Sequence, residues 1–395
     1  MRTESVALPR YFKTIREVEK QFDSMNVKIL SAMWKFGPRN LLEVARRTHI
    51  PFTTVYHRVR RLEGKTGRIA YLVPRTSLLG MQRVVILVSA SAGVEKLVTE
   101  ALMIPNLWRS INPCEGTFTH LSVHSVPINF IGGYKRFIRQ LSVCGLISRY
   151  QIIPTSDYFP NFPNFKYYNP RVKSWAYPWE KWLSSLRKIE PDETFEDPDG
   201  YPLLADKKDV LIIKELERNI RRRFSELTPM LGMTLQGVKY RYDRRLKPAG
   251  LIGPVGFDVY PYPAEISAFH EVMLEFADRN AMNKFYSLVD EMFFVHGVAK
   301  ILGRNAIIAR TYVAQPQVSN MFAFFSEIAK AGLVSSYSPI RMSFAGRQAQ
   351  TISYELFDDE EGWQFNLPTC LTKLRKLTRT SKVVAAARSS KKARA

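Results

Sequence analysis

The chain has 395 residues, of which 46% are hydrophobic and 24% are charged, a composition that excludes a disordered or fibrous protein. No apolar run reaches the roughly 18 residues of a membrane span, and the three scattered cysteines exclude a disulfide framework. Lys and Arg number 58 against 36 Asp and Glu, giving a formal net charge of +22. This charge favours a polyanionic partner, and we expect a cytoplasmic protein without a membrane partner.

Two stretches of the chain resemble one another at a fixed offset. Residues 23–61 align without a gap with residues 206–244, and eight of these positions are identical. A second offset, of 187 residues, places GLISRY at 145–150 over GLVSSY at 332–337. We therefore interpret the chain as two copies of one unit.

The first part of each copy is predicted to be a winged helix-turn-helix domain, over 23–80 and again over 206–262. In the first copy, apolar spacing indicates a helix from Asn26, a short helix over 41–48 and a third helix over 52–62. Pro51 fits the start of the third helix, where no amide hydrogen bond is lost. The stretch 64–74 is predicted to form a two-stranded wing.

A strand–helix–strand–strand–helix–strand pattern follows each of these domains. It covers 81–155 in the first copy and 263–345 in the second, and this order is that of a ferredoxin-like domain. The predicted fold class is therefore α+β, with two winged helix-turn-helix domains alternating with two ferredoxin-like (βαββαβ) domains.

The remaining segments are predicted to be connections. Residues 1–22 form an N-terminal arm, and 156–205 hold an aromatic and proline-rich strap over one copy, followed by an exposed acidic linker. Residues 346–377 form a C-terminal strap. The stretch 378–395 is basic and is expected to be disordered.

The third helix of each winged domain has a polar face that suits a DNA groove. Such a helix enters the major groove, where its first residues reach base edges and flanking cations meet phosphates. The candidate DNA-binding residues are Thr53, Thr54, Tyr56, His57, Arg60, Arg61, Lys65 and Arg68 in the first copy and Gln236, Lys239, Tyr240 and Arg244 in the second. We also expect Arg221, Arg222 and Arg223 to meet phosphates, and the stems of Arg58 and Arg241 to pack against the wings. The predicted partner is double-stranded DNA with an asymmetric site, because the two faces differ.

Three sequence motifs carry a resemblance to a known family. DSMNVKILSAM at 23–33, RVRRLEGKTGRIAYLVP at 58–74 and SLLG at 77–80 together resemble the Lrp/AsnC family of bacterial and archaeal transcription regulators. The resemblance implies a sequence-specific, nucleoid-associated regulator. In both copies the sequence keeps the family's Gly, at Gly116 and Gly303, and lacks the Asp that follows it near the amino-acid effector site. The effector and homo-oligomerisation therefore stay open.

Two alternatives to a regulator also stay open. Siroheme decarboxylases, tetrapyrrole enzymes, share this architecture, although their His- and Tyr-containing motif is not recognisable around His120 or His124. A non-specific chromatin protein would bind random DNA as tightly as any selected site. Because common catalytic motifs are absent, we expect no enzymatic activity and no cofactor. We expect the two histidines to form a surface or dimer-facing pair and to bind no metal.

Overall fold

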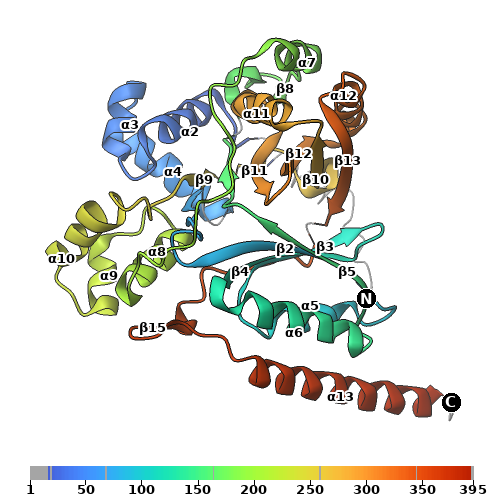
Figure 1. Ribbon diagram of the computed structural model, residues 1–395. Helices are drawn as coiled ribbons and strands as arrows, with labels where there is room; N and C mark the ends of the chain where they lie inside the picture. Colours follow the sequence, from blue (N-terminus) through green and yellow to red (C-terminus); the bar gives the residue numbers. More distant parts are fainter. Residues whose placement is uncertain are drawn as a thin grey trace.

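The computed structural model describes residues 17, 20–66, 69–162, 164–257, 259–343 and 345–392. Two helical heads lie side by side against a larger body made of two facing sheets with helices outside them (Figure 1). Among the described residues, no helix combines the length and the apolar character needed to cross a membrane.

The first head consists of three helices and one strand: α2 (Ser24–Phe36), α3 (Leu41–Thr48), α4 (Phe52–Thr66) and β1 (Ala70–Leu72). Asp23 caps α2 by accepting a hydrogen bond from the amide of Asn26, and Asn40 caps α3 in the same way. His49 ends α3 with a left-handed backbone at φ 54°, which turns the chain into α4.

The second head has the same order of elements: α8 (Lys207–Arg218), α9 (Phe224–Leu231), α10 (Leu235–Tyr240) with a π-helical turn (Arg241–Leu246), and β9 (Val255–Phe257). Thr234 caps α10 through the amide of Gly237. Apolar side chains fill the interior of each head, as the helical spacing predicts.

The wing of each head differs from the prediction of a local two-stranded hairpin. Among the described residues of the first wing, the one strand is β1, and it pairs antiparallel with β9 of the second head. Ala70 lies opposite Phe257, and Leu72 lies opposite Val255. Each three-residue strand thus obtains its backbone partners from the other head, which joins the two heads.

Both predicted ferredoxin-like units are present. The first contains β2 (Met81–Ala90), α5 (Glu95–Met103), β3 (Trp108–Glu115), β4 (His120–Pro127), α6 (Ile131–Val143) and β5 (Ile147–Thr155). The second contains β10 (Ser267–Phe276), α11 (Arg279–Leu288), β11 (Val295–Ile301), β12 (Ala306–Ala314), α12 (Val318–Lys330) and β13 (Val334–Met342). The predicted α+β fold class is confirmed.

The two sheets join at both edges. β13 pairs with β3, where Met342 lies opposite Cys114, and β11 pairs with β5, where Ile301 lies opposite Thr155. Within the described part of the chain, eight strands therefore close a ring in the order β12-β10-β13-β3-β4-β2-β5-β11, which returns to β12. A second apolar core, which includes Leu87 of β2, fills part of the space between the sheets.

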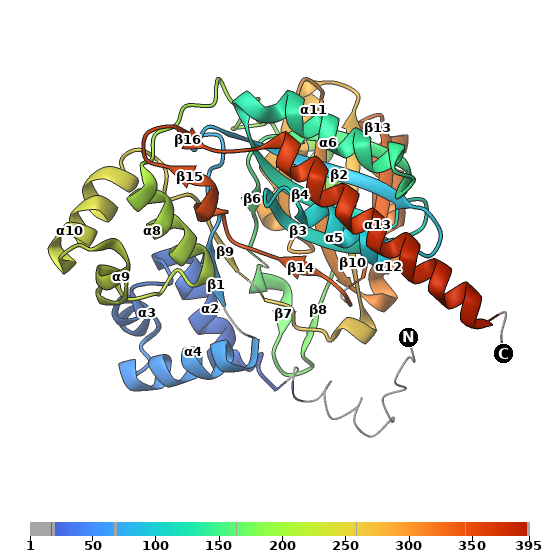
Figure 2. The ribbon, with the colours of Figure 1, turned by 90° about the horizontal axis from the view of Figure 1, so that it is seen from below.

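Each ferredoxin-like unit is covered by the segment that follows the other unit. After β5, the strap contains β6 (Phe159–Pro160), β7 (Tyr168–Asn169), β8 (Ser174–Trp175) and α7 (Trp179–Lys188), and α7 packs on α11 and α12. After β13, the chain contains β14 (Gln348–Ala349), β15 (Phe357–Asp358), β16 (Gly362–Trp363) and α13 (Leu367–Lys392). Figure 2 shows α13 crossing α5 and α6, and these helices are in contact.

The end of the chain departs from the predicted disordered tail. Helix α13 continues through the basic stretch to Lys392. The sequence VVAAAR at 383–388 lacks glycine and proline and contains three alanines, the residue with the highest helix propensity, so it extends the helix that begins at Leu367.

Candidate nucleic-acid interface

Helix α4 has one buried face and one outward face. Val55, Val59 and Leu62 are buried in the core of the first head and hold the helix in place. The predicted contact residues lie on the remaining surface, with Thr53, His57, Arg60 and Arg61 exposed and Thr54 and Tyr56 half-buried. Arg68 and the side chain of Lys65 lie outside the described residues.

The cations of α4 remain available to a ligand. The guanidinium of Arg60 lies 5.8 Å from the ring centroid of Tyr56, and its Nη1 is 3.4 Å from the Tyr56 hydroxyl. Within the part of the chain that the structure describes, neither Arg60 nor Arg61 forms an ion pair with a carboxylate. The outward face of α4 therefore carries two uncompensated positive charges.

The second head presents its third helix in the same manner. Gln236, Lys239, Tyr240 and Arg244 are all exposed, and Tyr240 has 67% of its surface open to solvent. Buried Val238 and Leu246 anchor this helix in the head. Among the described residues, no carboxylate forms an ion pair with Lys239 or Arg244.

The arginine tripeptide that precedes α9 is only partly available for phosphate contact. Arg221 binds Glu63 of the first head through Nη1 at 2.7 Å, and Arg222 is paired with buried Glu215. Arg223 alone of the three is exposed. Carboxylates of the protein already bind the guanidinium groups of Arg221 and Arg222, and the phosphate role of the three arginines stays a prediction.

The guanidinium groups of Arg58 and Arg241 form ion pairs within the heads. The packing of their stems against the wings stays a prediction. Arg58 binds Asp23, and Arg241 binds Asp206 and also Asp209, at 2.8 Å. These contacts fix the third helix of each head to the start of its first helix.

Arg39 joins the two heads, a role that the sequence analysis missed. Its Nη1 donates a hydrogen bond to the backbone carbonyl of Ile220, and its guanidinium lies 4.3 Å from the ring centroid of Phe224. Burial lowers the pKa of Arg39, as expected for a cation taken out of water. In the alignment of residues 23–61 with residues 206–244, Arg39 is identical to Arg222. This identity does not predict a contact between the two heads.

His120 and His124 do not form the expected surface pair. Both side chains are buried, and burial lowers the pKa of His124 to about 3. His120 is within hydrogen-bond distance of Thr99 on α5, at 3.0 Å, and the His124 ring lies 5.4 Å from that of Tyr134 on α6. The helices that cover this face of β4 explain the burial. The described residues contain no group of three His, Cys, Asp or Glu arranged to hold a metal ion.

Comparisons with known proteins bear on this fold. Neither a family model nor a curated protein matches the sequence. A crystal structure of the siroheme decarboxylase NirDL is 11% identical, covers 90% of this chain and 98% of its own, and has a TM-score of 0.47. The structure of PH0061 is 22% identical, covers 38% of this chain and 98% of its own, and has a TM-score of 0.31. AsnC of E. coli is 15% identical, covers 34% of this chain and 91% of its own, and has a TM-score of 0.27.

These neighbours change one expectation. Structures of AsnC-family regulators match about a third of the chain, whereas a structure that spans most of it belongs to an enzyme. This finding contradicts the prediction that the protein is not an enzyme. The absence of common catalytic motifs was an insufficient ground, because one architecture hosts different functions and an active site need not carry any of those motifs.

Proposed function

We propose that the protein is a DNA-binding regulator that contacts one duplex through two winged helix-turn-helix heads. The observation that carries this proposal is the exposure of the third helix in both heads, each with cations that no carboxylate of the described chain neutralises. A helix of this kind fits the major groove, and unpaired Lys and Arg gain free energy by displacing counterions from phosphates.

Each exposed helix divides into residues suited to bases and residues suited to phosphates. In the first head, Thr53, Thr54, Tyr56 and His57 stand at the beginning of α4, the part of a recognition helix that reaches base edges. Arg60 and Arg61 follow these residues about one helical turn later, and Lys65 and Arg68 come further along the chain. The proposed phosphate contacts of this head are Arg60, Arg61, Lys65 and Arg68.

The second head offers a different set of side chains. Gln236 suits a base edge, because its amide can both donate and accept hydrogen bonds. Lys239 and Arg244 suit phosphates, and Tyr240 suits either a sugar or a base. Because the two faces differ in sequence, we expect an asymmetric DNA site in place of the palindrome that identical heads favour.

The joint between the heads supports simultaneous binding. The β1–β9 pairing and the Arg221–Glu63 ion pair fix one head against the other, so binding of the first head brings the second to the same duplex. Such coupling raises affinity without additional contacts.

Binding of the full-length protein to fluorescent duplex DNA, followed by anisotropy across a range of salt concentrations, tests this proposal. If each head neutralises about four phosphates, a plot of the logarithm of affinity against the logarithm of salt concentration has a slope of roughly −7. A duplex selected from a random pool should bind more tightly than random DNA. Equal affinity for both supports a non-specific chromatin protein instead. A preparation with tetrapyrrole absorption and no affinity for DNA contradicts the proposal and favours the enzyme.

A further inference from the structure

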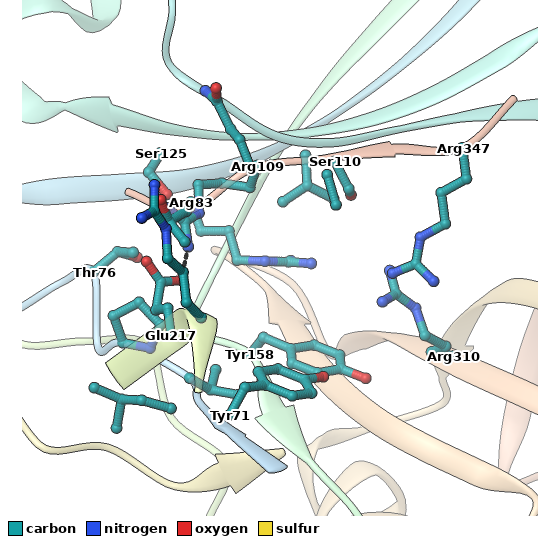
Figure 3. A pocket seen from close by; sticks show the side chains of 18 residues that line it. Tyr71, Thr76, Arg83, Arg109, Ser110, Ser125, Tyr158, Glu217, Arg310 and Arg347 are labelled. Atoms are coloured by element: carbon teal, nitrogen blue, oxygen red, sulfur yellow. Dashed lines mark hydrogen bonds and ion pairs between the residues drawn. The ribbon is translucent and has the colours of Figure 1, made fainter. Parts of the chain in front are cut away.

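A cavity of about 440 Å³ lies where the first wing meets the two sheets. Its wall includes Tyr71 and Leu72 of β1, Ser125 of β4, Glu217 of α8 and Tyr158 at the start of the strap. Five arginines line it against a single glutamate, and these are Arg83, Arg109, Arg218, Arg310 and Arg347. Figure 3 shows the labelled side chains gathered around this space.

Arg83 is a buried cation without a carboxylate partner. Its side chain lies in the interior of the protein, and its Nη1 donates a hydrogen bond of 2.8 Å to the hydroxyl of Thr155. Within the described residues, Arg83 forms no ion pair. Burial lowers the pKa of Arg83 to about 10. A guanidinium held out of water in this way is costly unless an anion accompanies it.

A second pair of guanidiniums faces the same space. Figure 3 shows Arg310 and Arg347 directed toward one another from opposite walls. Glu271 pairs with Arg310, whereas Arg347 forms no ion pair among the described residues and its buried Nε has no hydrogen-bond partner. The positive charge of Arg310 also repels the guanidinium of Arg83 and lowers the pKa of Arg83 further, and an anion among these groups would offset that repulsion.

Arg109 contributes another unsatisfied donor. Its Nη2 binds Glu217, while its Nη1 is buried and has no partner. Buried polar groups in folded proteins nearly always have hydrogen-bond partners, and a bound anion is one partner that could satisfy donors lining one cavity. Arg347 and Arg109 thus add two independent observations to the buried guanidinium of Arg83, which forms no ion pair among the described residues.

We infer that this cavity binds a small molecule with two or more carboxylate or phosphate groups. Guanidinium groups bind both of these anions in a bidentate manner, and the arginines stand on more than one wall, so one acidic group cannot satisfy them all. The volume lies within the range of small-molecule sites. The ring of Tyr158, with the guanidiniums of Arg83 and Arg310 at 5.5 and 5.4 Å from its centroid, would contact the carbon skeleton. This site is separate from the exposed helices α4 and α10 and does not depend on DNA binding.

Isothermal titration calorimetry of the full-length protein tests the site, with citrate, pyrophosphate and acetate as probes at matched ionic strength. We expect citrate or pyrophosphate to bind at least tenfold more tightly than acetate. Binding of citrate alone identifies a carboxylate site, binding of pyrophosphate alone identifies a phosphate site, and binding of both supports the shared chemistry.

Variants locate the binding in the cavity. Arg347→Gln should weaken binding at least tenfold, and Arg83→Gln should do the same if it folds. The control is Arg187→Gln, which replaces an exposed arginine on α7 outside the cavity and should leave affinity unchanged. The inference is overturned if neither multivalent probe binds more tightly than acetate, or if Arg347→Gln binds as tightly as the unmodified protein.

Discussion

Arg58 donates from Nη1 to both carboxylate oxygens of Asp23, at 3.0 and 2.7 Å, and thereby ties the third helix of the first head to the start of its first helix. At an offset of 183 residues, Arg241 binds Asp206 in the same way, at 3.0 and 2.8 Å. The cations on the outer faces of α4 and α10 therefore stand on helices whose orientation an internal ion pair fixes.

Replacement of Asp23 by alanine should destabilise the first head. The change removes both the cap of α2 and the partner of Arg58, and loss of the cap alone costs about 0.5–2 kcal/mol. Urea denaturation measures the difference, with Asp192→Ala in the exposed linker as control. Equal midpoints for Asp23→Ala and the control would contradict the assigned role.

The effect of Asp23 should depend on pH. Burial raises the pKa of Asp23, but the hydrogen bond from Arg58 and the amide of Asn26 lower it overall. A carboxyl whose pKa is lowered by folding stabilises the protein above its unfolded-state value of 3.8, and this contribution is lost as the pH falls through the folded-state pKa. The difference in stability between the unmodified protein and Asp23→Ala should therefore narrow in acid.

Removal of two cations from α4 should weaken DNA binding and reduce its salt dependence. Each phosphate contact contributes about 0.9 to the slope of log affinity against log salt, so Arg60→Ala/Arg61→Ala should make the slope less steep by roughly 1.8. Anisotropy titrations at several salt concentrations provide the measurement. The matched control, Arg187→Ala/Lys188→Ala, removes two exposed cations from α7. An identical loss of affinity in the control would show that only net charge matters.

The buried histidines should make the fold sensitive to mild acid. Burial lowers the pKa of His124 and His296 to about 3 and that of His270 to about 4, whereas the ordinary value is 6.5. Below pH 6.5 the unfolded chain binds protons that the folded protein does not. The free energy of unfolding therefore decreases as the pH decreases, by up to about 1.4 kcal/mol per pH unit for each histidine.

Denaturation at pH 7.5 and pH 5 tests this expectation. The free energy of unfolding should be lower at pH 5, and His124→Gln should reduce the difference between the two conditions. If the unmodified protein is equally stable at both values, at least some of these histidines are protonated in the folded state.

Trp182 of the aromatic strap should act in folding and not in nucleic-acid stacking. It is 1% exposed, and its ring lies 5.4 and 5.3 Å from those of Phe293 and Phe294. Trp182→Ala should lower the free energy of unfolding by about 3–5 kcal/mol, while DNA affinity at a temperature where the variant is folded stays unchanged. Val172→Ala, at an exposed position of the same strap, is the control. A selective loss of DNA affinity would indicate that the ring contacts bases.

Much of the fold could be predicted because local patterns determine the elements. The strand–helix–strand–strand–helix–strand pattern of the first copy predicts a strand over 148–153, and the structure has β5 over Ile147–Thr155. Helical spacing predicts a helix over 318–331, where α12 covers Val318–Lys330. In both cases the interior of the element is correct and the ends shift slightly, since capping and pairing decide where an element stops.

The contacts between distant parts of the chain could not be predicted. The pairing of β1 with β9 and the bond from Arg39 to Ile220 join residues more than 180 positions apart, and no local pattern encodes such partners. Arg83 and Arg310 each stand alone in an apolar strand, so nothing in the sequence marks them as walls of one cavity. The burial of His120 depends likewise on which face of β4 receives helices.

Hydroxyl-radical footprinting on a selected duplex tests most directly whether two heads contact one DNA molecule. The full-length protein should protect two separate segments of the duplex. Arg60→Ala/Arg61→Ala should lose protection at one segment, and Lys239→Ala/Arg244→Ala should lose it at the other. A single protected segment that both variants weaken equally, or no protection at all at low salt, would contradict the account.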